Sequence, residues 1–116
     1  MRSKRSRATE ISQKTRILVA ERDEGCIFCR MGYRFEDYPP DPFAASIPEM
    51  MHFVPRSLGG LGSERNLAVG CKYHHTLYDN GNKGLHGEMK EFFREYLMQQ
   101  YPDWKDEDTV YQRWAV

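Results

Sequence analysis

The sequence predicts an α+β domain. Apolar residues recur at helical spacing near both ends of the chain, and two short β-type runs lie between these segments: MMHFV (residues 50–54) and NLAVGC (residues 66–71). The 116 residues, 40% of them hydrophobic, provide for one modest core. We therefore expect a single domain over residues 9–116, with its core over about residues 24–82, behind a flexible basic arm at residues 1–8.

The two terminal segments predict helices with one apolar face each. In residues 9–23, Thr9 can cap the helix, and one face collects Ile11, Thr15, Leu18 and Val19. A C-terminal helix is expected over about residues 85–100, where apolar positions recur every three or four residues: Leu85, Met89, Phe92, Phe93, Tyr96 and Leu97. We interpret this stripe as core packing.

The two β-type runs are expected to pair as a hairpin with a long connection. Pro55 closes the first run, and a cluster of glycines precedes the second. A further helix should begin close to His74 and end by Asn80 and Gly81, which favour a helix end. Four prolines in residues 30–48 exclude a long helix there and predict an irregular loop.

Charge is balanced over the whole chain but unevenly distributed. Lysine plus arginine and aspartate plus glutamate each number 17, so the net charge selects no class of partner. The first seven residues nevertheless carry four cations, Arg2, Lys4, Arg5 and Arg7. Two interpretations stand: a flexible arm that lies along phosphates, or a solvated tail without a partner.

No segment approaches the roughly 20 apolar residues that a membrane-spanning helix needs, and the N-terminal MRSKRSR does not lead into the apolar run of a signal peptide. We expect a cytoplasmic protein with no membrane partner. The odd number of cysteines, three, then favours metal binding or free thiols over disulfide bonds.

Three cysteines and a histidine form two short pairs of metal ligands. Cys26 and Cys29 give C-x2-C, and Cys71 and His74 give C-x2-H further along the chain. Four such donors are what a closed tetrahedral zinc site requires, whereas a redox C-x-x-C alone would leave the second pair unexplained. We therefore predict a structural zinc site, in which an exchange of His74 for His75 stays open.

A second set of residues remains once His74 is assigned to zinc. His75 points about 100 degrees further around the predicted helix, and Asp79 follows one turn later on the same face. A histidine and a carboxylate so spaced can hold one divalent cation. Taken alone, His52 is more simply a buried histidine bonded to backbone. Its correlation with Asn66, His75 and the zinc pairs favours a functional site.

At these residues the sequence resembles the HNH endonucleases, also called His-Me finger or ββα-metal nucleases, and in particular their small zinc-knuckle form from bacteria and phages. The resemblance is carried by CIFC, HFVPRSLGGLGSERNLAVGC and CKYHHTLYDN, within the stretch from Cys26 to about Gly81. The order of histidine, P-x-S-x-G-G, asparagine and C-x2-H-H follows the family's. The resemblance implies a ββα-metal core with a structural zinc knuckle, flanked by N-terminal and C-terminal helices.

The resemblance also implies a role for each residue. His52 matches the general base, Asn66 the middle asparagine, His75 the last histidine, and Asp79 a metal ligand one turn later. Asn66 either ligates the cation or holds the hairpin so that His52 is aimed correctly. Arg56 resembles a phosphate contact, although an exposed arginine at a strand end needs no function. The implied cofactors are Zn²⁺ in the knuckle and Mg²⁺ or Mn²⁺, with Ni²⁺ as a further candidate, in the catalytic site.

One position departs from the family pattern. Many members carry Asp or His immediately before the base as a direct metal ligand, and here that position is Met51. A thioether is a poor ligand for Mg²⁺, which prefers oxygen. Either the cation is held by fewer protein groups, or Glu49, on the same face of the strand, supplies an oxygen, or activity is lost.

The implied function is a metal-dependent endonuclease that hydrolyses phosphodiester bonds of double-stranded DNA, with His52 as general base and one cation at the scissile phosphate. The basic arm would contact the DNA backbone. Two alternatives belong to other classes: a catalytically silent, zinc-stapled DNA-binding module, and a structural adaptor whose partners are phage head or packaging proteins.

Overall fold

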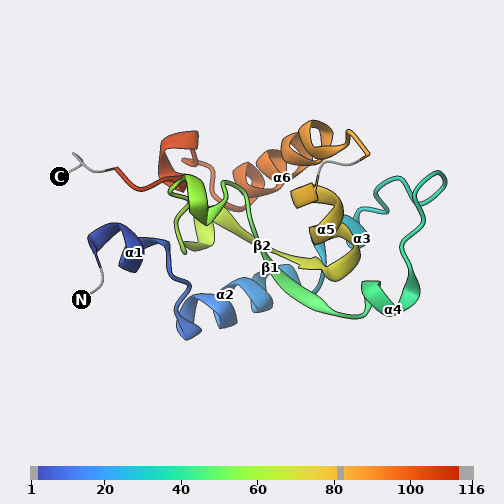
Figure 1. Ribbon diagram of the computed structural model, residues 1–116, viewed down its shortest axis with the longest axis horizontal. Coiled ribbons are helices and arrows are strands. Elements are labelled where there is room, and N and C mark those ends of the chain that lie inside the picture. The colour runs from blue at the N-terminus through green and yellow to red at the C-terminus, as the bar shows by residue number, and fades with distance from the viewer. Residues whose placement is uncertain (1–2, 81–82, 113–116) are drawn as a thin grey trace.

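The computed structural model describes residues 3–80 and 83–112, and it confirms the predicted α+β class (Figure 1). Two strands, β1 and β2, pair in one antiparallel sheet, around which the helices are arranged. The elements are α1 (Lys4–Thr9), α2 (Gln13–Asp23), α3 (Ile27–Arg30), α4 (Pro42–Ala45), β1 (Pro48–His52), β2 (Leu67–Cys71), α5 (Lys72–Asn80) and α6 (His86–Gln100), with 3-10 turns η1 (Arg56–Leu58), η2 (Glu64–Asn66) and η3 (Asp106–Thr109).

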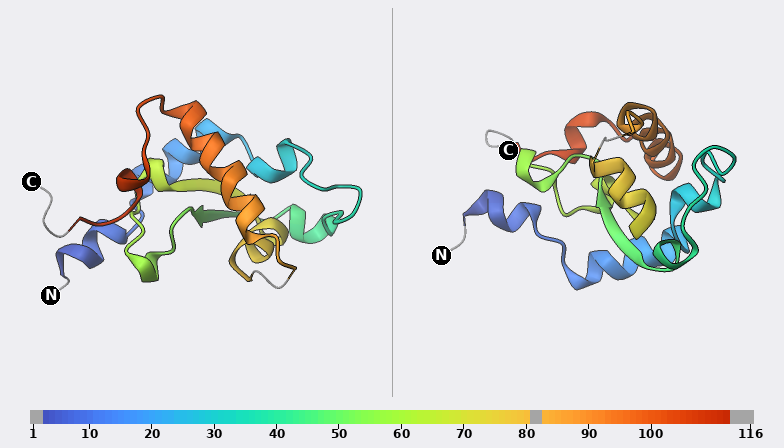
Figure 2. Two further views of the ribbon diagram at one scale, coloured as in Figure 1. Left: turned by 90° about the horizontal axis from the view of Figure 1, so that it is seen from above. Right: turned by 45° about the vertical axis from the view of Figure 1, so that its right-hand side comes forward.

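The predicted hairpin is confirmed. Its register runs from Pro48 opposite Cys71 to His52 opposite Leu67, so His52 occupies the last position of β1. All five residues of β2 are buried, whereas β1 is partly exposed. The hairpin lies between α2 on one side and the α5–α6 pair on the other (Figures 1 and 2).

The N-terminal helix differs from the prediction. Residues 9–23 do not form one helix: α1 ends at Thr9, the chain is extended at Glu10, and α2 begins at Gln13. The cause is Ser12, whose hydroxyl accepts a hydrogen bond from the backbone N–H of Thr15 and so caps α2 in place of Thr9. Most of the expected flexible arm is therefore helical.

Most of the core lies between the hairpin and the last two helices. Phe53, Tyr78 and Phe93 are fully buried, and the Phe93 ring contacts Phe53 edge-on and Tyr78 at a tilt. The predicted stripe on α6 (His86–Gln100) is confirmed at its centre, because Met89, Phe93 and Leu97 are buried, but Phe92 is 39% exposed. No helix in the described part of the chain combines the length and the apolar character needed to cross a bilayer.

Candidate metal centre and adjoining histidine site

Cys26, Cys29, Cys71 and His74 converge as predicted. Their ligand atoms all lie within 4.8 Å of one another, and they form the one such cluster of donors among the described residues. His74 Nδ1 lies 3.5 Å from Cys26 Sγ, 3.4 Å from Cys29 Sγ and 3.3 Å from Cys71 Sγ. The fourth donor is therefore His74 and not its neighbour His75.

These separations fit a tetrahedral zinc ion. With Zn–S near 2.3 Å and Zn–N near 2.1 Å, tetrahedral angles place two sulfurs about 3.8 Å apart and a sulfur and a nitrogen about 3.6 Å apart. Cys29 Sγ and Cys71 Sγ are 3.8 Å apart, and the three sulfur–nitrogen distances fall between 3.3 and 3.5 Å. The four residues can hold a structural zinc ion without rearrangement.

The backbone around each pair explains how the donors are aimed. The N–H of Cys29 donates to Cys26 Sγ and the N–H of His74 donates to Cys71 Sγ, each at 3.4 Å. Each C-x2 pair is thus a tight knuckle at a helix start, the first opening α3 and the second leading from β2 into α5. The two knuckles join the segment after α2 to the end of the hairpin.

The thiols influence one another's protonation. Burial raises the pKa of Cys29 and the charges of Cys26 and Cys71 raise it further, and burial likewise raises the pKa of Cys71. Burial also acts upward on Cys26, but hydrogen bonds from His74 and from backbone N–H groups outweigh it and lower that pKa to about 7. Three thiolates this close require a cation, and zinc binding deprotonates coordinating thiols.

His75 lies between two carboxylates on the outer side of α5. Its Nδ1 is 2.8 Å from Glu49 Oε1, and its Nε2 is 3.0 Å from Asp79 Oδ2. A neutral imidazole has one N–H, so it can donate to only one of these carboxylates. The other nitrogen then presents a lone pair to a carboxylate oxygen.

The distance between His75 Nε2 and Asp79 Oδ2 is that of an ordinary ion pair, and it also equals the separation of two neighbouring ligands of one cation. An octahedral ion with ligand distances near 2.1 Å places neighbouring donors about 3.0 Å apart, the distance between His75 Nε2 and Asp79 Oδ2. One cation can take only one ring nitrogen, so Glu49 on the opposite nitrogen would orient the ring as carboxylates orient metal-binding histidines. The sequence suggests Glu49 as an oxygen ligand of the cation. In the structure its carboxylate instead contacts His75 Nδ1.

His52 occupies the end of β1 with an unpaired ring nitrogen. Its Nε2 is buried and has no hydrogen-bond partner among the described residues. Burial lowers the pKa of His52 below the usual 6.5, and the charge of His75 acts in the same direction while Asp79 opposes it. Arg56 and Arg16 lower this pKa further. His52 is consequently neutral at neutral pH and able to accept a proton.

Asn66 bonds backbone groups with both polar atoms of its side-chain amide. The side chain is fully buried, and its Nδ2 donates to the carbonyls of Val54 and Leu61 at 3.1 and 2.9 Å. Its Oδ1 accepts from the N–H of Val54 at 2.9 Å. These bonds fix the chain that follows His52.

Met51 is a core residue. It is fully buried, and a Cβ at Gly70 would lie 2.3 Å from its Sδ, so the glycine makes room for the thioether. A metal ligand at position 51 would have to leave this packing. The residue before His52 therefore faces the interior of this domain.

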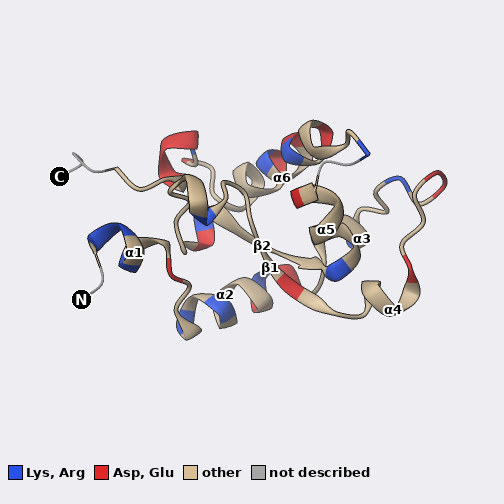
Figure 3. Cartoon of the chain, in the orientation of Figure 1, with Lys and Arg blue, Asp and Glu red and all other residues tan. Residues whose placement is uncertain are grey.

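The basic residues take defined places. Lys4, Arg5 and Arg7 lie on α1, whereas Arg2 lies outside the described residues. Figure 3 shows Lys and Arg gathered on α1 and α2 and acids around η3. Arg56 points toward α1, because its Nε donates to Thr9 Oγ1 at 3.0 Å.

One residue near the site was missed by sequence reasoning. Arg16 on α2 acts on the pKa of His52 and lines, with Glu49, a hollow of about 420 Å³ between α2 and the hairpin. No local motif distinguishes Arg16 from other arginines of the helix, so only the three-dimensional packing reveals it.

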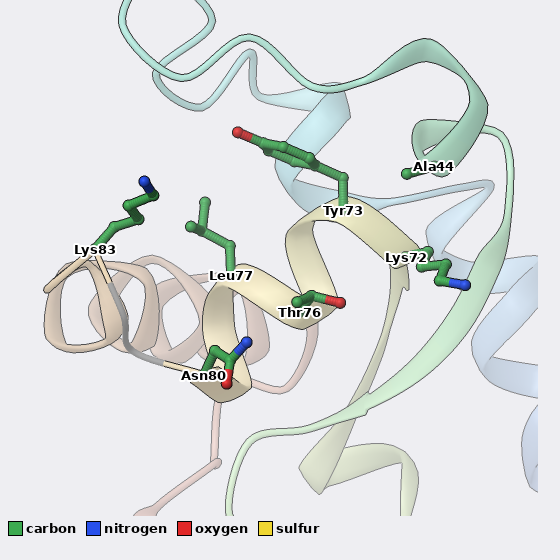
Figure 4. A pocket seen from close by; sticks show the side chains of 7 residues that line it. All are labelled: Ala44, Lys72, Tyr73, Thr76, Leu77, Asn80 and Lys83. Carbon is green, nitrogen blue, oxygen red and sulfur yellow. The ribbon is translucent and has the colours of Figure 1, made fainter.

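A second hollow lies on the other flank of α5 (Figure 4). Its volume is about 330 Å³, and Tyr73 and Leu77 project toward the same side of the helix. Neither His75 nor Asp79 lines it, so the candidate site does not extend into this hollow.

Comparison with known proteins identifies no relative: no family model, curated protein or solved structure matches the chain.

Proposed function

We propose that this protein is a metal-dependent endonuclease that hydrolyses phosphodiester bonds in double-stranded DNA, built as a His-Me finger stapled by zinc. The observation that carries the proposal is the arrangement around His52. The His52 ring ends β1, its pKa is lowered, and its Nε2 has no hydrogen-bond partner among the described residues. Helix α5, which contacts β1, supplies His75 and Asp79 at the separation of two neighbouring ligands of one cation.

Each residue has a task in the proposed reaction. His52 accepts the proton of the attacking water, which its neutral state at pH 7 allows. Asn66 holds the turn after β1 so that this ring stays aimed at the phosphate. His75 and Asp79 would hold Mg²⁺ or Mn²⁺, with Glu49 orienting the His75 ring. When bound, such a cation supplies charge stabilisation at the scissile phosphate and at the leaving oxygen.

The zinc site has a separate task. Cys26, Cys29, Cys71 and His74 would hold the start of α5 against the chain that leaves α2. His75 is the residue after a zinc ligand, so the ion fixes the helix that presents the catalytic donors.

The test is cleavage of supercoiled plasmid with Mg²⁺, Mn²⁺ or Ni²⁺, comparing the native chain with His52→Ala. Loss of general-base catalysis lowers the rate about 10²- to 10⁴-fold. A control is His86→Ala, because the His86 ring packs on Tyr78 and bonds its carbonyl and belongs to neither donor set. Metal-dependent nicking that disappears in His52→Ala and persists in His86→Ala supports the proposal.

Met51 favours one alternative function. Because the residue before His52 supplies no ligand, the chain would be a silent DNA-binding module if the cation cannot bind. Salt-dependent retention of DNA with no cleavage in any metal would establish that function. Absence of both cleavage and DNA affinity at low salt would favour a structural adaptor for phage assembly or packaging proteins.

A further inference from the structure

A hollow of about 350 Å³ lies between α1 and the turn η1 (Arg56–Leu58), which begins four residues after His52. Six residues line it, and we call it the α1–η1 hollow: Ser3, Arg5, Ser6, Thr9, Arg56 and Ser57. The left view of Figure 2 shows this turn beside α1, although the two segments are far apart in sequence.

The two arginines tie the walls of the hollow together. Arg56 reaches from η1 to α1, where its Nε donates to Thr9 Oγ1 at 3.0 Å and its Nη2 to the carbonyl of Ser6 at 3.4 Å. Arg5 reaches in the other direction and donates from Nη2 to the carbonyl of Ser57 at 3.1 Å. These bonds fix both guanidinium groups and occupy only part of the donors that a guanidinium offers.

The lining is suited to an anion. Two guanidinium groups and four hydroxyl-bearing residues face the hollow, and none of the six lining residues carries a carboxylate. The two guanidinium groups repel each other, and an anion bound between them would attract both. Guanidinium forks and hydroxyls are the groups that bind phosphate oxygens in protein–DNA complexes.

The hollow also lies close to the proposed catalytic residues. The charge of Arg56 acts on His52, whose pKa it lowers, so the guanidinium is within electrostatic reach of that ring. A DNA strand with its scissile phosphate at His52 would carry further phosphates along its backbone, one for each nucleotide.

We infer that the α1–η1 hollow binds one backbone phosphate of the DNA, next to but distinct from the phosphate that is cleaved, through Arg5 and Arg56 together. This inference rests on the proposed function, because it takes DNA as the substrate. It assigns α1 to substrate positioning and gives the otherwise peripheral N-terminal helix a function.

The experiment measures DNA binding without cleavage. Fluorescence anisotropy of a labelled duplex of about 20 base pairs is followed over a series of KCl concentrations, with no divalent cation added to the purified protein. We expect Arg5→Ala and Arg56→Ala each to weaken binding about tenfold and to reduce the slope of log Kd against log salt by about one. The double variant should lose much less DNA affinity than the product of the two single-variant losses, because both arginines hold the same phosphate.

Two variants control for folding and for net charge. Arg5→Gln keeps amide donors for the Ser57 carbonyl but removes the charge, and it should weaken binding as Arg5→Ala does while the melting temperature is retained. Lys4→Ala removes one charge from the same helix at a residue that does not line the hollow, and it should weaken binding less than about threefold.

Two results would overturn the inference. One is an effect of Arg5→Ala no larger than that of Lys4→Ala. The other is a double variant whose loss equals the product of the single losses, which would mean two separate contacts. Inorganic phosphate exchanged for chloride at constant ionic strength tests for a free anion: if it binds tightly while Arg5→Ala leaves DNA affinity unchanged, the hollow takes a small anion and not a strand. Because the assay needs no cleavage, the proposed nuclease activity and this inference can fail separately.

Discussion

His74 and His75 are consecutive residues of one helix, yet they lie in opposite chemical environments. His74 is fully buried, with three sulfurs within 3.5 Å of its Nδ1 and the rings of Phe28, Tyr33 and Tyr73 around it. The His75 side chain is 23% exposed and lies between the carboxylates of Glu49 and Asp79. Successive helical residues point about 100 degrees apart, which is enough to place one ring inside the core and the other on its edge.

In the proposed nuclease, this difference would keep the structural zinc site apart from the reaction. Soft thiolates with one imidazole select zinc, whereas carboxylates with one imidazole suit a harder cation. Each histidine thus belongs to a different donor set, although only one peptide bond separates them. Substitutions on the His74 side should abolish folding, and substitutions on the His75 side should abolish reaction while the fold persists.

The largest expected effect is that of removing the zinc ligands. Structural zinc contributes about 10 to 16 kcal/mol in small zinc domains, comparable with or larger than the whole stability of a domain of this size. Cys26→Ala, or treatment of the native chain with a strong chelator, should therefore abolish the cooperative melting transition followed by circular dichroism. A zinc-free Cys26→Ala protein with a normal melting curve would contradict the assignment, and zinc content measured by mass spectrometry provides the control.

The second effect concerns the other side of the helix. His75→Ala should keep its zinc and its melting temperature but cleave plasmid about a thousandfold more slowly, because the cation supplies several kcal/mol of transition-state stabilisation. Thr76→Ala is the matched control, since Thr76 is the next residue of α5 and is exposed. Unfolding of His75→Ala, or an equal loss in Thr76→Ala, would show that the two donor sets are not separable.

A smaller effect is expected at Glu49, which contacts the ring and not the cation. Glu49→Gln keeps the size of the side chain but removes the charge that orients His75 through Nδ1. Loss of such an orienting group costs about 10- to 100-fold in metal affinity or activity. The readout is the Mg²⁺ concentration for half-maximal cleavage, which should rise. An unchanged metal requirement would mean that Asp79 alone positions the ring.

Features set by short-range geometry could be predicted from the sequence. Both C-x2 pairs, the position of His75 beside a zinc ligand and its spacing to Asp79 depend on turns of one or two residues, which the sequence determines directly. The hairpin and the C-terminal helix followed from periodicity in the same way.

Features that depend on contacts between distant segments could not be predicted from the sequence. The pairing of Glu49 with His75 depends on how α5 packs against β1, and the role of Asn66 depends on carbonyls of Val54 and Leu61 that only the folded turn brings near. The start of α2 was misplaced because Ser12 and Thr9 are both good caps, and propensity alone does not choose between them. The packing of the chain makes each of these choices.

The smallest expected effect is the pH dependence of cleavage. It adds His52 to the comparison between His74 and His75. Burial and the nearby charge of His75 lower the pKa of His52 below 6.5. A general base acts in its deprotonated form, so the cleavage rate should rise with pH through a midpoint below 6.5 and then level off. Competition between protons and the cation at the proposed metal site would also slow the reaction, but that contribution depends on metal concentration. Single-turnover rates measured at several Mg²⁺ concentrations separate the two: the His52 midpoint stays fixed as Mg²⁺ rises, whereas a midpoint that moves with Mg²⁺, or one above 6.5, would assign the pH dependence to the metal site instead.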